Sequence, residues 1–208
     1  MRIAVIGTGN VGGALGTRWA QGGHNVIFAS RDPESEKART LLLRAGPSAR
    51  VTTLREAVAD AEIVVLATPW QAAQETLTAA GDLSGKIVID ATNPLKDMKL
   101  AVGHTTSAGE QVAVWATDAR VVKAFNNVGA GTMADADYRG QKPTTFICGD
   151  DAQAKHTVAQ LAEELGFEVV DAGPLTSARY LEPLAVLWIT LAYSQGMGPN
   201  IAFKLLRR

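Results

Sequence analysis

Short runs of apolar residues recur along the chain, and polar or helix-like segments separate them. Several runs are apolar almost throughout instead of alternating with polar residues. This is typical of strands covered on both faces in a parallel sheet. The pattern predicts strands at Arg2–Ile6, Val26–Ala29, Ile63–Ala67, Lys86–Asp90, Val121–Phe125, Thr144–Cys148 and Phe167–Asp171. It therefore indicates an α/β protein with a mainly parallel sheet.

Helix signals fill the gaps between the predicted strands. The segments "NVGGALGTRWAQGG" and "DAQAKHTVAQLAEELG" are predicted helices; the second begins at Asp151 and ends at Gly166. The longest apolar stretch lies in "EPLAVLWITLAYSQG" and holds roughly ten residues, against the roughly 20 that a membrane-spanning helix needs. We interpret it as a buried or subunit-facing helix.

One soft boundary divides the chain. The segment "KAFNNVGAGTMADADYRGQKP" is rich in glycine and small residues. It separates residues 1–142 from a smaller C-terminal lobe, residues 143–208, which we expect to continue the same sheet.

Composition narrows the classes of partner. The formal net charge of the 208 residues is -1, so no general attraction to nucleic acid or to an anionic membrane is expected. The single cysteine, Cys148, excludes an intramolecular disulfide and a cysteine-based metal site, and it fits a reducing cytoplasm.

The apolar run at the start is interrupted by glycines, so no secretory signal is expected. The three histidines, His24, His104 and His156, lack metal-ligand spacing, and no metal is predicted.

The clearest motif is a glycine turn after the first predicted strand. Gly7, Gly9 and Gly12 match the G-x-G-x-x-G pattern of dinucleotide-binding folds. Gly7 permits a tight turn, Gly9 lets the backbone approach a pyrophosphate, and Gly12 lets the helix lie close to the strand. The anion would then lie at a helix N-terminus. A purely structural turn is the alternative.

Ser30 and Arg31 follow the second predicted strand, where NAD-binding chains place an acidic residue. A hydroxyl and a guanidinium can donate hydrogen bonds to a 2′-phosphate, so NADP(H) is favoured. We assign Asp32 to the cap of the helix in "DPESEKART". The alternative for Arg31 is an ordinary solvated loop residue.

Three more loops should meet at the carboxyl edge of the sheet: "ATPWQ" with Thr68, "ATNPL" and "KAFNNVG". No hydrolytic constellation is visible. Hydride transfer between a nicotinamide and another ring needs alignment more than a proton donor, and only Lys123 or His104 could serve as a donor.

Taken together, the segments "VIGTGNVGGALGTRWAQGGHNVIFASR", "ATPW", "CGDD", "DAGPLTSARYLE" and "GMG" followed by "FKLL" resemble NADPH-dependent F420 reductases from Arg2 to Leu206. The resemblance implies a Rossmann-type, doubly wound fold, with an NADP-binding domain at residues 1–142 and a smaller C-terminal helical lobe. It also implies NADP(H), coenzyme F420 (an 8-hydroxy-5-deazaflavin), a homodimer, and hydride transfer in a cleft between the lobes. By position it implies pyrophosphate contacts from Thr8, Gly9, Asn10 and Val11, 2′-phosphate contacts from Ser30 and Arg31, a groove lined by Pro69 and Trp70, a nicotinamide side with Asn93 and Pro94, and a deazaflavin side with Asn126, Val128, Met197, Gly198 and Pro199.

One segment departs from that family. Where its deazaflavin loop tends to present histidine and then isoleucine, this chain has Asn126 and Val128, and "KAFN" is similar to the reductase domain of the six-transmembrane metalloreductases, which pair NADPH with a flavin. We hypothesise an oxidoreductase that transfers hydride between NADP(H) and F420. The alternatives are an NADPH-dependent flavin (FMN/FAD) or metal reductase, a small imine or carbonyl reductase, and a non-catalytic NADPH-binding sensor.

Overall fold

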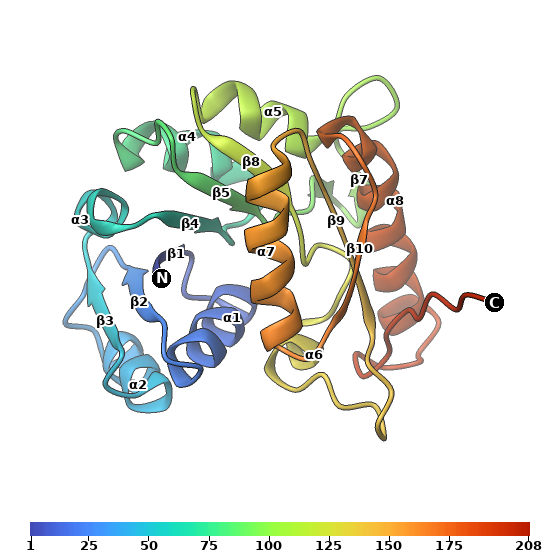
Figure 1. Ribbon diagram of the computed structural model, residues 1–208, viewed down its shortest axis with the longest axis horizontal. Helices are drawn as coiled ribbons and strands as arrows, with labels where there is room; N and C mark the ends of the chain where they lie inside the picture. Colours follow the sequence, from blue (N-terminus) through green and yellow to red (C-terminus); the bar gives the residue numbers. More distant parts are fainter.

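One eight-stranded sheet organises the chain, and the computed structural model describes residues 1–208. The strand order is β10-β9-β8-β5-β4-β1-β2-β3, which runs across Figure 1 from β10 on the right to β3 on the left. The strands of this sheet are β1 (Arg2–Ile6), β2 (Asn25–Ala29), β3 (Ala49–Thr52), β4 (Ile63–Leu66), β5 (Ile87–Asp90), β8 (Arg120–Lys123), β9 (Thr144–Gly149) and β10 (Glu168–Asp171).

Helices cover both faces of the sheet. Their bounds are α1 (Asn10–Gln21), α2 (Glu36–Ala45), α3 (Leu54–Asp60), α4 (Trp70–Ala80), α5 (Ala108–Trp115), α6 (Ala130–Ala134), α7 (Ala152–Glu164) and α8 (Ala178–Ile189). The buried residues form two apolar clusters. One contains residues of α1, α2 and α7, and the other contains residues of α3, α4, α5 and α8. Two clusters on one sheet are what a doubly wound fold requires, so the predicted Rossmann-type α/β class is confirmed.

The last two strands extend the same sheet with a change of direction. Strands β3, β2, β1, β4, β5 and β8 are parallel, whereas β9 pairs antiparallel to β8, and β10 is parallel to β9. Helix α8 follows β10 and packs on α5 (Figure 1). The division into residues 1–142 and 143–208 stays a prediction.

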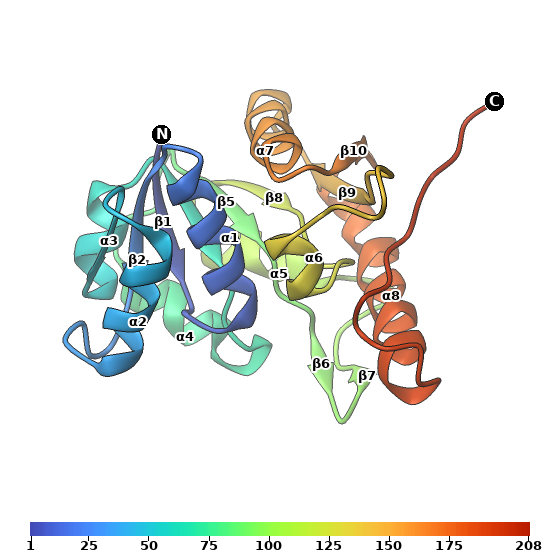
Figure 2. The ribbon, with the colours of Figure 1, turned by 90° about the horizontal axis from the view of Figure 1, so that it is seen from below.

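A small hairpin projects from the carboxyl edge. Strands β6 (Leu95–Lys96) and β7 (Lys99–Leu100) pair antiparallel, and the turn residues Asp97 and Met98 both have positive φ. Figure 2 shows the hairpin beside α8, which β7 contacts. The sequence pattern gave no prediction of this hairpin or of β3, because each strand has only two to four residues and none is fully buried.

Two predicted helix starts have different outcomes. Helix α7 starts at Asp151 as predicted: this residue is the N-cap, and its carboxylate accepts a hydrogen bond from Ala154 N at 2.7 Å. The assignment of Asp32 as the cap of α2 is wrong. Ser35 is the N-cap, and its hydroxyl accepts from Ala38 N at 3.3 Å, whereas Asp32 accepts from Glu34 N in the preceding turn.

Candidate functional site

The glycine turn, residues 7–12, joins β1 to α1 at the carboxyl edge of the sheet. Gly7 has φ +105°, and a Cβ atom there would lie 2.4 Å from Ala67 O. A Cβ atom at Gly12 would lie 1.9 Å from Gly7 O. Both glycines are therefore required by the fold itself. A Cβ atom at Gly9 would meet nothing within 4 Å, so Gly9 faces open space where another molecule can approach the backbone.

The N-terminus of α1 has no side-chain cap. Gly9 is the N-cap residue and no acidic residue lies in the first turn. Thr8 and Val11 are half-buried, whereas Asn10 is exposed. The first amide N–H groups of a helix have no partner within the helix, and its dipole favours an anion there. This end of α1 therefore has the features of an anion site.

Ser30 and Arg31 lie after β2, beside the glycine turn in the order of the sheet. The Ser30 hydroxyl donates to Asp32 O at 2.9 Å. Arg31 is exposed and takes part in none of the ion pairs of the chain. The nearby carboxylate of Glu34 pairs with Arg39 instead, at 3.6 Å. The Arg31 guanidinium is thus available to a phosphate.

The loop after β4 adjoins the glycine turn through Ala67. Its Thr68 hydroxyl is buried and has no hydrogen-bond partner, and Pro69 is the exposed N-cap residue of α4. Trp70 is half-buried, and its ring packs on the ring of Trp115 with the centroids 5.1 Å apart. This packing fixes the indole at the α4–α5 contact.

The loops after β5 and β8 meet through two asparagines. Asn93 Nδ2 donates to Asn126 O at 2.9 Å, and Asn126 Nδ2 donates to Asn93 Oδ1 at 3.2 Å. Asn126 Nδ2 also donates to Leu181 O of α8 at 2.8 Å, which ties both loops to the C-terminal helix. Asn126 Oδ1 is buried without a partner. Pro94 is buried next to this pair in the sequence.

The turn after α8 closes on the β8–α6 loop. A Cβ atom at Gly129 would lie 2.7 Å from Trp188 Cζ2 and 3.3 Å from Pro199 O, so Pro199 lies against the residue that follows Val128. Val128 is itself buried in the core and offers little surface to a ligand. Met197 is 60% exposed, and Gly198 has φ +78°. The structure thus places the Pro199 turn against the β8–α6 loop, and the deazaflavin contacts implied by the resemblance stay a prediction.

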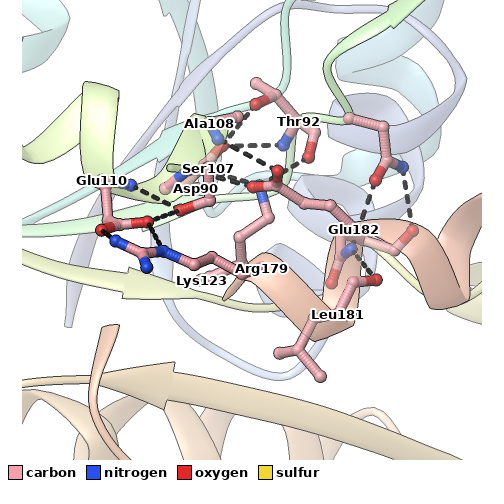
Figure 3. Close-up of polar contacts among 12 residues, drawn as sticks. Asp90, Thr92, Ser107, Ala108, Glu110, Lys123, Arg179, Leu181 and Glu182 are labelled. Atoms are coloured by element: carbon pink, nitrogen blue, oxygen red, sulfur yellow. Dashed lines mark hydrogen bonds and ion pairs between the residues drawn. The ribbon is translucent and has the colours of Figure 1, made fainter. Parts of the chain in front are cut away.

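Strands β5 and β8, which lead into these two loops, end at Asp90 and Lys123, and both residues belong to a buried ion cluster with Glu182 (Figure 3). Lys123 Nζ lies 2.7 Å from Asp90 Oδ2, 3.0 Å from Glu182 Oε1 and 2.9 Å from Thr92 O. The side chains of Lys123 and Asp90 are wholly buried, and that of Glu182 is 1% exposed. Burial by itself would lower the pKa of Lys123, but the charges of Asp90 and Glu182 outweigh it and hold that pKa above its ordinary value.

The remaining bonds of the cluster satisfy its carboxylates. Glu182 Oε2 and Oε1 accept from Ala108 N and Gly109 N, each at 3.0 Å, at the N-terminus of α5. Asp90 Oδ1 accepts from Thr92 N at 2.9 Å and from the Thr92 hydroxyl at 2.7 Å (Figure 3). The cluster has one cation and two anions, and the amide groups and dipole of α5 offset the extra negative charge.

The two side chains considered as proton donors lie in different surroundings. Lys123 Nζ has three acceptor oxygens within 3.0 Å, all of them in the buried cluster. His104 lies in an exposed turn with φ +64°. No group of three or more His, Cys, Asp or Glu residues is arranged to hold a metal ion, and no helix has the length and apolar character to cross a membrane.

Sequence reasoning missed the cluster, although a signal was present. Asp90 and Lys123 are charged residues at the ends of apolar strands, and Glu182 interrupts an otherwise apolar stretch of α8. A charge in such a position is seldom buried unless it is paired. The three residues could therefore have been proposed as mutual partners.

Comparison with known proteins identifies the family. The model of the family described as "NADP oxidoreductase coenzyme F420-dependent" matches residues 2–94. The F420-dependent NADP reductase of Methanothermobacter thermautotrophicus is 34% identical over 213 residues, which cover 92% of this chain and 89% of that protein. The chain belongs to the F420-dependent NADP reductase family. The predicted family and the predicted class of NADP-dependent oxidoreductase are confirmed.

The chain is also similar to a protein of known structure and to a metalloreductase. A crystal structure from Arthrobacter sp. FB24, with a provisional assignment as an F420-dependent NADP reductase, is 36% identical and superposes with a TM-score of 0.91 over 100% of both chains. The rat metalloreductase STEAP3 is 35% identical over 189 residues, which cover 89% of this chain. The chain spans only 37% of the length of that metalloreductase.

Proposed function

We propose that the chain transfers hydride between NADP(H) and coenzyme F420, in a cleft between the carboxyl edge of the sheet and the C-terminal lobe. The observation that carries the proposal is the uncapped N-terminus of α1 next to the unpaired Arg31, within a chain that aligns over most of its length with an F420-dependent NADP reductase. The combination supplies a site for a pyrophosphate and a second site for a 2′-phosphate.

The residues of the first site fit the dinucleotide. Gly9 leaves room for the pyrophosphate, Thr8, Asn10 and Val11 would surround it, and Ser30 and Arg31 would hold the 2′-phosphate. The buried Thr68 hydroxyl without a partner supports a polar contact in the next loop, beside Pro69. One side of the Trp70 ring packs toward Trp115, so the rest of the ring would line the groove.

The second site would lie where Asn93, Asn126 and the Met197–Pro199 turn approach one another. Bound NADP(H) and F420 supply the hydride donor and acceptor carbons. The chain contributes alignment and the exclusion of water, since the asparagine pair joins the β5 and β8 loops to α8. Because Lys123 Nζ is wholly buried and lies within 3.0 Å of three acceptors, the site favours a ring system that accepts hydride without a proton from the protein over an imine or carbonyl substrate.

A flavin or metal reductase is the second candidate. The 35% identity to rat metalloreductase STEAP3 and the Asn126 amide favour it, because a family histidine is absent at this position. In this case the dinucleotide site is unchanged and only the acceptor differs. We also propose a homodimer, with the exposed apolar side chains of Tyr180, Leu187 and Tyr193 on and after α8 as the contact.

A spectral titration of the NADPH-bound protein with F420, FMN and FAD separately tests the acceptor, and the same mixtures report turnover through NADPH absorbance. We expect F420 alone to be bound tightly and to be reduced over many turnovers. Reduction of FMN or FAD with no response to F420 would establish the second candidate. No accelerated NADPH oxidation with any acceptor would favour a non-catalytic sensor.

A further inference from the structure

The buried ion cluster connects parts of the chain that belong to the two sides of the proposed cleft. Asp90 and Thr92 follow from β5 into the loop that carries Asn93. Lys123 ends β8, three residues before Asn126. Glu182 lies in α8, next to Leu181, whose carbonyl accepts from Asn126. One ammonium group therefore contacts the nicotinamide-side loop and the helix of the acceptor side at once.

We infer that Lys123 and Glu182 are positioning residues, which set the Thr92–Pro94 loop and α8 in a fixed relation so that donor and acceptor rings meet at a productive distance. The inference rests on the proposed function for the identity of the two rings, and it goes beyond that proposal by assigning a task to side chains that touch neither. Lys123 acts through Thr92 O, and Glu182 acts through Lys123 and the N-terminus of α5.

A comparison with a neighbouring ion pair distinguishes two roles for the cluster: positioning of the Thr92–Pro94 loop, and attachment of α5 to α8. A second ion pair joins the same two helices: Arg179 of α8 donates to both carboxylate oxygens of Glu110 in α5, at 2.6 and 2.8 Å (Figure 3). Glu110 makes no hydrogen bond or ion pair with Thr92, Asn93 or Asn126; its other partner is Ser107, in the N-terminal turn of α5. If the cluster only held α5 against α8, the Glu110–Arg179 pair would be equivalent to it.

Three variants use this contrast. Glu182→Gln keeps the size of the side chain, but its amide nitrogen cannot accept a hydrogen bond from an α5 amide, and the charge of the cluster falls to zero. Lys123→Met removes the bond to Thr92 O directly. Glu110→Gln is the matched control, because it makes the same chemical change on the same pair of helices.

Amide hydrogen exchange of the ligand-free protein tests the positioning without reference to activity. Thr92 N and Leu95 N, which bond to Asp90 Oδ1 and Asn93 O, report on the loop and do not touch Glu182. We expect both to exchange about tenfold faster in Glu182→Gln and in Lys123→Met, and to change little in Glu110→Gln. Unchanged Thr92 and Leu95 amides in Glu182→Gln, or equal acceleration in Glu110→Gln, would overturn the inference.

Kinetics of the holoenzyme supply the second measurement. Glu182→Gln should lower kcat for F420 reduction by about tenfold or more, since small misplacements are costly to a transfer step. Its Kd for NADPH should stay close to that of the wild type, and its isotope effect with NADPH deuterated at C4 should rise. A fall in NADPH affinity with kcat unchanged would contradict positioning. If the wild type does not reduce F420, the proposed function fails, and the exchange experiment still decides the present inference.

Discussion

The glycine turn and the buried ion cluster lie on the same edge of the same sheet, and they are built in opposite ways. At the glycine turn, the α1 N-terminus has no side-chain cap and Arg31 has no ionic partner. In the cluster, by contrast, the charges of Asp90, Lys123 and Glu182 are buried and paired with one another. The glycine turn leaves its polar groups available to a ligand, whereas the charged groups of the cluster are paired with one another inside the protein.

This difference indicates which substitutions should affect ligand binding and which should affect the stability of the fold. A region with unpaired groups can lose a side chain with little effect on folding, because its bonds form only when the ligand binds. A region of buried, paired charges cannot, because removal of one partner leaves an uncompensated charge. We therefore expect substitutions in the cluster to lower the free energy of unfolding, and the substitution of Arg31 to weaken ligand binding.

Lys123→Met should have the largest effect on stability. It leaves the carboxylates of Asp90 and Glu182 buried without their cation, and the free energy of unfolding should fall by about 3 to 5 kcal/mol. Urea denaturation measures this loss. Arg31→Ala is the control and should shift the same quantity by less than about 0.5 kcal/mol. Similar denaturation midpoints for Lys123→Met and the wild type would contradict the proposed difference in stability between the two regions.

Gly12→Ala should have the next largest effect, because it tests the part of the glycine turn that belongs to the fold. The new methyl group would lie 1.9 Å from Gly7 O, and we expect a loss of about 1 to 3 kcal/mol in the free energy of unfolding. Gly13→Ala, in the same helix, would meet only Leu41 Cδ1 at 3.8 Å and should stabilise α1 by up to about 1 kcal/mol. The two neighbouring changes should therefore have opposite signs in chemical denaturation.

Arg31→Ala should act on binding alone. Loss of its charge-assisted hydrogen bonds to a 2′-phosphate should weaken NADPH binding by about 1 to 3 kcal/mol and leave NADH binding nearly unchanged. Isothermal titration calorimetry with both nucleotides checks this. An equal loss for NADPH and NADH would show that Arg31 contacts something other than the phosphate.

Glu110→Gln should have the smallest effect and should depend on pH. The hydrogen bond from Arg179 holds the pKa of Glu110 below its ordinary value of 4.5 in the folded chain. The carboxylate therefore stabilises the fold above that value, and the contribution is lost as the pH falls through the folded-state pKa. Thermal unfolding should show a modest deficit for the variant at neutral pH, which shrinks in acid. A difference in thermal stability between variant and wild type that stays constant with pH would show that the ionised Glu110 carboxylate is not its source.

The two regions also differ in how far the sequence predicts them. The roles of Gly7 and Gly12 follow from a motif of six residues, and the cap at Asp151 follows from its immediate neighbours. Both kinds of signal are local, and the structure contains both features. The cap of α2 was missed because several polar residues compete there, and Ser35 is adjacent to the helix whereas Asp32 is not.

The cluster could not be predicted from local pattern. Lys123 is 33 residues from Asp90, and Glu182 is 73 and 74 residues from the α5 amides that it accepts from. Such contacts depend on the antiparallel turn of the sheet at β9 and on the return of α8 to α5, neither of which periodicity reveals. The short strand β3 was missed for a different reason, since none of its four residues is buried and its apolar pattern is weak.

The central claim is direct hydride transfer between NADP(H) and F420, and an isotope-tracing experiment tests it most directly. The protein is incubated with F420 and NADPH that carries deuterium at both C4 positions of the nicotinamide, in ordinary water, and the reduced deazaflavin is examined by mass spectrometry. We predict one deuterium atom in the ring of the reduced F420. Reduced F420 that carries only hydrogen from water, or no reduction at all, would contradict the account.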